Sequence, residues 1–112
     1  MSAVCKILLS RRSVRLVGPP TVARALRRDE LSAVVVETHV SAGRVNDVWW
    51  LLYGRSGAPA LRAPQGATGE KDLVDWLMSL PGFDIDAMTR AMHFRGNGTF
   101  ELWRAPAVAA EP

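Results

Sequence analysis

The stretch Asp47-Val48-Trp49-Trp50-Leu51-Leu52-Tyr53 decides the fold, because six consecutive apolar residues stand between turn residues on either side. The run is too short for an independent helix, and its aromatic residues favour a pleated strand with both faces covered. Side chains alternate across a strand. One face would carry Val48, Trp50 and Leu52, and the other Trp49, Leu51 and Tyr53. The stretch therefore predicts the central strand of an α+β domain, with two helices over one face and a strand layer over the other.

Apolar and β-branched segments on both sides of this stretch predict further strands. They are residues 4–9, 13–17, 21–28, 32–40, 58–63 and 99–103. The segment 21–28 also fits a helix, because Val22 and Leu26 lie four residues apart; we favour a strand that forms a hairpin with 13–17. The pattern predicts a mostly antiparallel sheet of about five or six strands, packed by two C-terminal helices in a single domain.

The two helices are predicted by a change of period after Gly69. Apolar residues recur at helical spacing between Leu73 and Leu80, with Thr68 or Gly69 as the cap and acids in the first turn. Asp84 is the predicted N-cap of the second helix, with Phe83 and Met88 positioned as a hydrophobic staple. We expect this helix to end near Gly96.

Length and composition indicate one soluble globular domain. The chain has 112 residues, 48% of them hydrophobic and 22% charged, and a mean hydropathy of +0.04. We expect the domain to span residues 1–105 and the Ala/Pro-rich segment 106–112 to be a flexible tail. Cys5 has no partner for an internal disulfide, the N-terminal segment does not read as a signal peptide, and no apolar run is long enough to cross a membrane. These features favour a cytoplasmic protein.

Charge is unevenly distributed behind a formal net charge of +3. Residues 1–28 carry seven basic side chains and no acid, and the remaining residues sum to −4. The basic segment contains Lys6, Arg11, Arg12, Arg15, Arg24, Arg27 and Arg28. The helical segment concentrates Glu70, Asp72, Asp75, Asp84 and Asp86. Such runs form solvated faces, or they indicate an anionic partner at the basic end or a basic partner at the acidic end.

The residues that could support catalysis or cofactor binding do not form a known motif. Gly66-Ala67-Thr68-Gly69-Glu70-Lys71-Asp72 superficially resembles a phosphate-binding loop, but Glu70 separates the glycine from the lysine and Asp72 replaces the hydroxyl residue. Cys5, His39 and His93 lack metal-ligand spacing, and no nucleophile motif surrounds Cys5 or any serine. We predict no cofactor, no metal and no catalytic residues. An unrecognised site around these three residues is the enzyme alternative.

Several segments resemble small uncharacterised bacterial proteins with a pleckstrin-homology-like sheet. The segments are Arg28-Asp29-Glu30-Leu31-x-x-Val34, Val48 to Leu52, Pro64 to Gly69 and Leu80 to Asp84. The resemblance covers residues 13–104 and concerns the layout of strands and helices, so no functional residue is carried over. The second helix and the strand at 99–103 depart from a plain pleckstrin-like plan.

These observations predict a non-enzymatic protein-interaction module. A small chain without a catalytic constellation fits a bacterial immunity or accessory protein that blocks a toxin or enzyme by covering it. The acids Glu70, Asp72, Asp75, Asp84 and Asp86 would form the face for a basic protein partner. The alternative is nucleic-acid binding through Arg11, Arg12, Arg15, Arg24, Arg27 and Arg28. An exposed edge strand would also allow a homo-oligomer, and no membrane association is expected.

Overall fold

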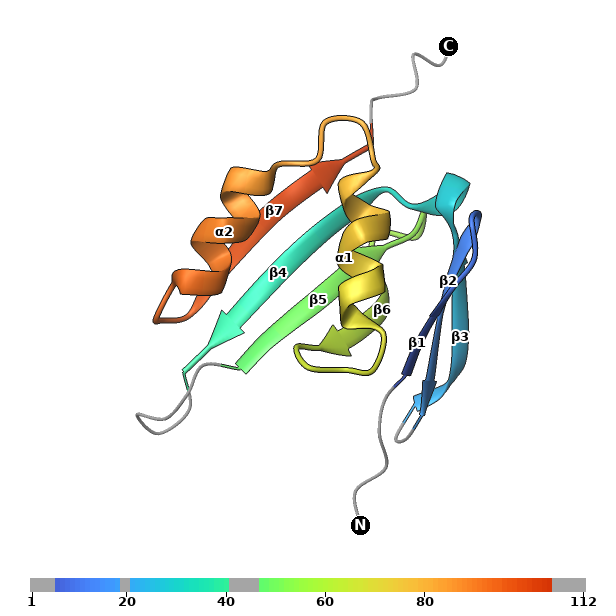
Figure 1. Cartoon of the computed structure of the whole chain (residues 1–112), viewed down its shortest axis with the longest axis horizontal. Helices are drawn as coiled ribbons and strands as arrows, with labels where there is room; N and C mark the ends of the chain where they lie inside the picture. Colours follow the sequence, from blue (N-terminus) through green and yellow to red (C-terminus); the bar gives the residue numbers. More distant parts are fainter. Residues whose placement is uncertain (1–5, 19–20, 41–46, 106–112) are drawn as a thin grey trace.

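Two antiparallel sheets and two helices make up the computed structural model, which describes residues 6–18, 21–40 and 47–105 (Figure 1). The first sheet has the order β1-β2-β3, with β1 at Lys6–Leu9, β2 at Ser13–Gly18 and β3 at Thr21–Arg27. The second has the order β6-β5-β4-β7, with β4 at Ala33–His39, β5 at Asp47–Tyr53, β6 at Pro59–Pro64 and β7 at Gly98–Arg104. The helices are α1 at Glu70–Met78 and α2 at Ile85–His93.

The α+β class, the antiparallel pairing and the two helices are confirmed, but the prediction of one sheet of about five or six strands is wrong. The segment 21–28 forms a strand, with Val14 opposite Leu26 in the expected hairpin. A short 3₁₀ turn, η1 (Arg28–Glu30), then carries the chain from the first sheet to the second. β3 does not pair with β4, because β5 and β7 occupy both edges of β4. The seven described strands are therefore divided between two sheets.

A single apolar core lies on one side of the four-stranded sheet. Val48, Trp50 and Leu52 of β5 point into it, as the alternation predicts, and α1 adds Leu73 and Leu77. The three-stranded sheet contributes the buried residues Ile7, Val14, Leu16 and Leu26 to the same core. Figure 1 shows both helices in front of the four-stranded sheet, with the smaller sheet beside them. Burial of these side chains is the main source of stability.

The opposite face of the four-stranded sheet has no layer over it in the described part of the chain, so the expected strand layer there is wrong. Ala33, Val35 and Leu51 point to this face and are buried, yet they lie outside the core cluster. Neighbouring side chains of the same sheet screen them. A hollow of about 420 Å³ on this side is lined, as far as the described residues go, by the sheet and its connections, with Val35 and Tyr53 among them. We call this side the bare sheet face.

The helix starts follow the sequence signals more closely than the helix ends. Gly69 caps α1 at φ 93°, where a Cβ atom would collide with the carbonyl oxygen of Ile7, so glycine is required. Asp84 caps α2 as predicted and accepts a 2.9 Å hydrogen bond from the amide of Ala87. However, α2 ends at His93 because Phe94 is extended, and Gly96 lies beyond the helix without the left-handed conformation of a helix-ending glycine. The staple between Phe83 and Met88 stays a prediction.

The predictions on membrane spans, on the C-terminal tail and on Cys5 have different outcomes. None of the helices in the described ranges has the length and apolar character needed to cross a membrane. The predicted tail at 106–112 and the residue Cys5 lie outside the described residues.

Candidate functional site

Two of the five predicted acidic partner-binding residues, Glu70 and Asp84, are engaged in internal contacts. The Glu70 carboxylate accepts a 2.7 Å hydrogen bond from the Trp50 indole Nε1 and a 2.9 Å bond from the backbone amide of Gly66. Asp84 uses Oδ1 to cap α2. The carboxylate of Glu70 thus occupies the loop that superficially resembled a phosphate site.

The other three acids, Asp72, Asp75 and Asp86, are exposed and make no hydrogen bond or ion pair within the described ranges. Asp72 and Asp75 lie on α1 and line a shallow groove of about 520 Å³ together with Arg11 of the β1–β2 turn. Asp86 lies in the first turn of α2. The acidic set is therefore split between internal contacts and two separate helix surfaces.

An apolar surface accompanies these acids on the helices. Small side chains, Ala87 and Ala91, are the buried residues of α2 and allow the helix to lie close to β7 and β4. The larger Ile85 is 48% exposed at the start of the helix. Met88 and Met92, one helical turn apart, are half-buried along its flank.

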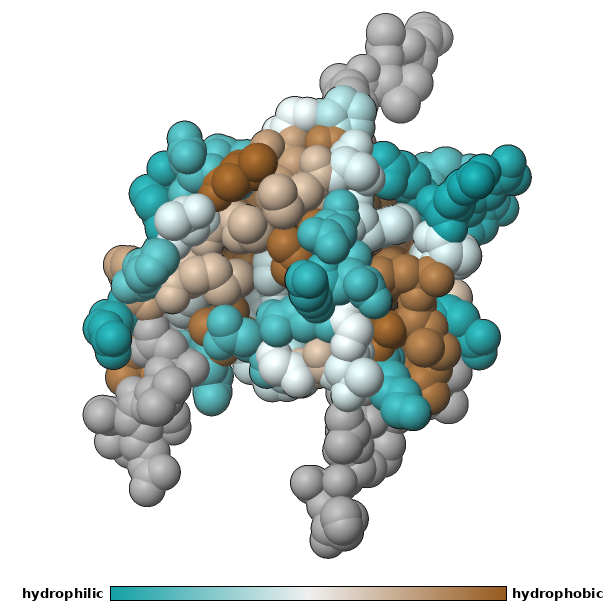
Figure 2. All heavy atoms as spheres, viewed as in Figure 1, coloured by the Kyte–Doolittle hydropathy of each residue, from teal (hydrophilic) through white to brown (hydrophobic). Residues whose placement is uncertain are grey.

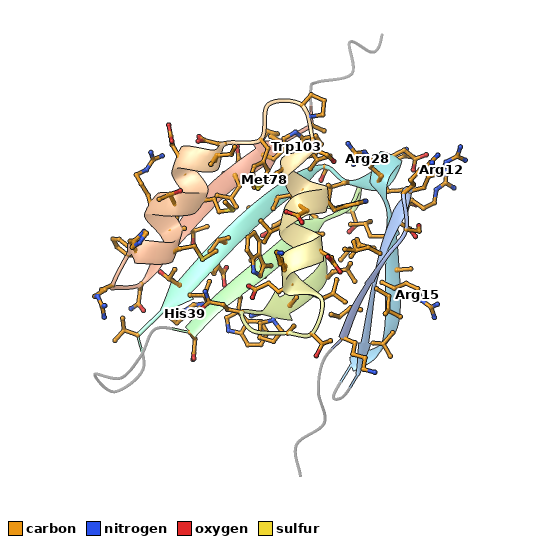
Figure 3. All side chains as sticks on the ribbon, in the orientation of Figure 1. Arg12, Arg15, Arg28, His39, Met78 and Trp103 are labelled. Atoms are coloured by element: carbon orange, nitrogen blue, oxygen red, sulfur yellow. The ribbon has the colours of Figure 1, made fainter. Side chains whose placement is uncertain are left out.

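α1 contributes Met78, which is 41% exposed and lies between the two helices (Figure 3). Figure 2 shows apolar side chains gathered over α2 and toward α1. We define the helical apolar face as Met78, Ile85, Met88 and Met92. α1 and α2 make little direct contact with each other, and Met78 and Ile85 remain exposed beside the half-buried Met88 and Met92.

The predicted nucleic-acid-binding arginines are only partly brought together. Arg12, Arg27 and Arg28 line one pocket of about 460 Å³, whereas Arg11 faces the groove with Asp72 and Asp75. Arg15 is exposed on β2, away from that pocket (Figure 3). Arg24 belongs to β3, and its side chain lies outside the described residues. The six residues do not form one basic track in the described part of the protein.

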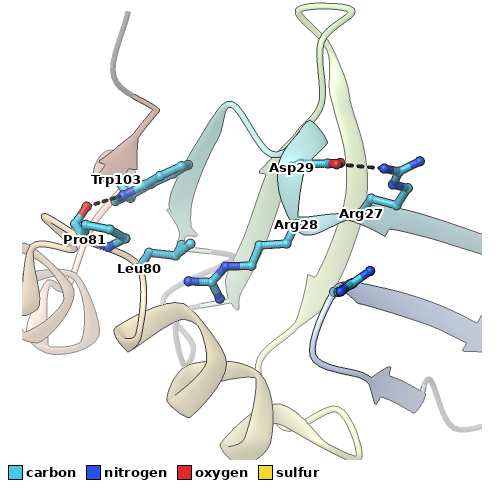
Figure 4. Close-up of a pocket in the computed structure, with 7 residues that line it drawn as sticks. Arg27, Arg28, Asp29, Leu80, Pro81 and Trp103 are labelled. Carbon is cyan, nitrogen blue, oxygen red and sulfur yellow. Dashed lines mark hydrogen bonds and ion pairs between the residues drawn. The ribbon is translucent and has the colours of Figure 1, made fainter. Parts of the chain in front are cut away.

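We call the first of these cavities the arginine pocket. Besides the three arginines it is lined by Asp29, Leu80, Pro81 and Trp103 (Figure 4). Its lining thus comes from the β1–β2 turn, from η1 and the residue before it, from the α1–α2 connection and from β7. Leu80 and Trp103 are buried, and the Trp103 indole donates a 2.8 Å hydrogen bond to the carbonyl oxygen of Pro81. The pocket combines a fixed apolar floor with a cationic rim.

The bare sheet face is a third candidate surface, which the sequence analysis missed. Trp49 lies half-buried on it under the Arg62 guanidinium, whose Cζ is 5.2 Å from the ring centroid. Glu101 hydrogen-bonds Arg104 and raises the pKa of that guanidinium above its ordinary value. The signal available was one charged residue in the interior of each of three strands, namely Glu37 of β4, Arg62 of β6 and Glu101 of β7. Such residues mark a solvated side of the sheet.

The two histidines are held in local contacts. The His39 ring shares a 3.1 Å hydrogen bond with Glu37, and Nδ1 of His93 lies 2.9 Å from the carbonyl oxygen of Thr89. Over the described ranges, no group of three or more His, Cys, Asp or Glu residues is placed to hold a metal ion.

No family model, curated protein or solved structure matches the chain. The pleckstrin-homology-like resemblance stays a prediction, and the function must be argued from the surfaces themselves.

Proposed function

We propose that the chain is a non-enzymatic protein-interaction module that binds a partner protein through the helical apolar face. The observation that carries the proposal is the exposure of Met78 and Ile85 beside two further half-buried methionines. Methionine is flexible and polarizable, and it is common on surfaces that adapt to a partner. Large apolar side chains that gather on one exposed surface are typical of interaction sites.

The charge of the helices defines the chemistry of the partner. Residues 70–93 contain five acids against Lys71 and Arg90, and Asp72, Asp75 and Asp86 have no intramolecular partner in the described part of the chain. The complementary surface is an apolar anchor surrounded by lysine or arginine. Glu70 and Asp84 are left out of this surface because their carboxylates serve the fold.

A module of this kind suits an immunity or accessory role, in which a small domain covers a toxin or enzyme and blocks it. The proposed contact needs no cofactor and no catalytic group on this chain. Apolar anchors would provide most of the affinity, and the acids on the helices would raise the association rate and select basic partners.

The test compares two substitutions of equally exposed residues. Ile85 and Leu8 are each 48% exposed, on α2 and β1 respectively. Wild-type chain, Ile85→Lys and Leu8→Lys would be immobilised and used to capture proteins from a lysate of the source organism, with nuclease treatment and at low and high salt. We expect Ile85→Lys to lose the captured protein and Leu8→Lys to retain it, because a lysine in the helical apolar face removes an anchor and repels a basic partner.

Three results would contradict the proposal. Capture that both variants lose equally indicates general adhesion, and capture that vanishes with nuclease indicates nucleic acid. Capture of a second copy of this chain alone, with a matching dimer in size-exclusion chromatography, would indicate a homo-oligomer instead. Asp75→Lys with Asp86→Lys must also weaken binding; unchanged binding would remove the acids from the interface.

A further inference from the structure

The arginine pocket is lined by none of the four residues that define the helical apolar face. We propose that it binds a small organic oxyanion, a phosphate or carboxylate group carried on an apolar or aromatic body. Its volume of about 460 Å³ is in the range of small-molecule sites, which combine an apolar lining with a few placed polar groups. The lining joins three arginines to one aspartate, so its formal charge is positive.

Contacts to the C-terminal end of α1 hold the Arg28 side chain in place. Its Nη1 donates to Oγ of Ser79 at 3.1 Å, its Nη2 donates to the carbonyl oxygen of Ser79 at 3.4 Å, and its Cζ is 5.5 Å from the centroid of the Trp76 ring. A guanidinium group has five N–H donors in a planar fork. The contacts to Ser79 use two of them, and the remaining three have no partner within the described ranges.

Arg12 and Arg27 complete the cationic rim. The amide of Arg28 donates a 2.6 Å hydrogen bond to the carbonyl oxygen of Arg12, which fixes the β1–β2 turn beside η1. The Arg12 guanidinium has no hydrogen bond or ion pair in the described part of the protein, and Arg27 uses one nitrogen on Asp29 at 2.7 Å. Arginine forks match the oxygens of phosphate and carboxylate, and such charged hydrogen bonds are the strong ones.

The apolar floor of the arginine pocket favours such a small ligand over a nucleic-acid strand. Leu80, Pro81 and Trp103 offer apolar contact beside the guanidinium groups. However, Trp103 is buried and Trp76 is covered by Arg28, so neither ring is an open platform on which successive bases could stack. Arg15, the next basic residue along β2, does not line the pocket. The geometry fits a single anionic group with a compact body.

The experiment titrates the full chain with phenyl phosphate, benzoate and inorganic phosphate, followed by calorimetry and by the NMR signal of the Trp103 indole N–H. The variants are Arg12→Ala and, as a matched control, Arg15→Ala, which removes the same charge from the same sheet outside the pocket. We expect one-site binding of phenyl phosphate or benzoate, a shift of the Trp103 signal, and affinity for inorganic phosphate at least roughly tenfold lower. Arg12→Ala should weaken binding roughly tenfold or more, and Arg15→Ala less than about twofold.

The tighter of the two organic probes identifies the anion as phosphate or carboxylate. The proposal is overturned if neither probe saturates at millimolar concentration, if inorganic phosphate binds as tightly as both, or if the two variants weaken binding equally. Tight binding of a single-stranded oligonucleotide that depends equally on Arg12 and Arg15 would likewise replace it with general polyanion binding. The shift of the Trp103 signal in the wild-type protein tests the site without any substitution.

Discussion

Trp49 and Trp50 are neighbours in the sequence and lie on opposite faces of the same strand. Trp50 points into the core, is 1% exposed, and its indole N–H is satisfied by the Glu70 carboxylate. Trp49 points to the bare sheet face, remains half-buried, and has the Arg62 guanidinium over its ring. The tryptophan on the core side of the sheet therefore has an acid at the edge of its ring. The tryptophan on the bare sheet face has a cation over the face of its ring. Both contacts follow from the charge distribution of an indole, which is positive at the N–H edge and negative over the ring.

This difference shows what covers each face of the sheet. On the core side, Trp50 belongs to a cluster to which both helices and the second sheet contribute side chains, so its neighbours cannot move freely into a vacated space. On the bare sheet face, Trp49 is half-buried and, within the described ranges, has the Arg62 side chain over its ring, which can rearrange or admit water. The stability of the protein should therefore depend on the two tryptophans very unequally.

The largest expected effect is from Trp50→Ala. Loss of a fully buried indole should lower the free energy of unfolding by about 3–5 kcal/mol, because a cavity remains and the Glu70 carboxylate loses its donor. Trp49→Ala should cost no more than about 1–2 kcal/mol. Guanidinium chloride unfolding monitored by circular dichroism measures both. If Trp50→Ala does not fold, Trp50→Phe keeps most of the ring and should still be less stable than Trp49→Phe; equal losses would contradict the comparison.

Much of the fold was predictable from local patterns. Alternation in 47–53 identified β5 and the residues that share each of its faces, the change of period located both helices, and Asp84 located the cap of α2. These signals work because a strand, a helix and a cap each depend on residues close together in the sequence. The division into two sheets was not predictable, since it depends on β7 pairing with β4 across 60 residues or more, from Thr38 with Gly98 to Ala33 with Arg104.

The candidate sites were less predictable, because they too depend on contacts between residues that lie far apart in the sequence. A cluster of acids in the sequence did not reveal that Glu70 reaches Trp50, on a strand that precedes it by a turn, another strand and a loop. The basic segment correctly supplied Arg12, Arg27 and Arg28, but the floor of the arginine pocket comes from Leu80, Pro81 and Trp103, far along the chain. Charge is visible in sequence, whereas its partners and its burial are set by tertiary contacts.

A smaller effect should separate Glu70 from the other acids. Glu70→Ala leaves the buried N–H of Trp50 and the amide of Gly66 without an acceptor, and should cost about 1–3 kcal/mol in denaturant unfolding. Asp72→Ala, also in the first turn of α1 but exposed and without such contacts in the described ranges, should change stability by no more than about 0.5 kcal/mol. Similar losses in the two variants would mean that only the helix dipole is being measured.

The smallest effect concerns the cation over Trp49. Arg62→Ala removes both the charge and the apolar stem above the ring, and should cost about 0.5–1 kcal/mol in the same unfolding measurement. Arg62→Met separates the two contributions, because it keeps a flexible apolar chain over the indole and removes the charge. If the ring is held by the cation, Arg62→Met should be almost as unstable as Arg62→Ala, and Arg62→Lys should restore part of the loss. If Arg62→Met is instead as stable as the wild-type protein, apolar screening alone covers Trp49, and the bare sheet face stabilises its tryptophan in the same way as the core does, only with fewer neighbours.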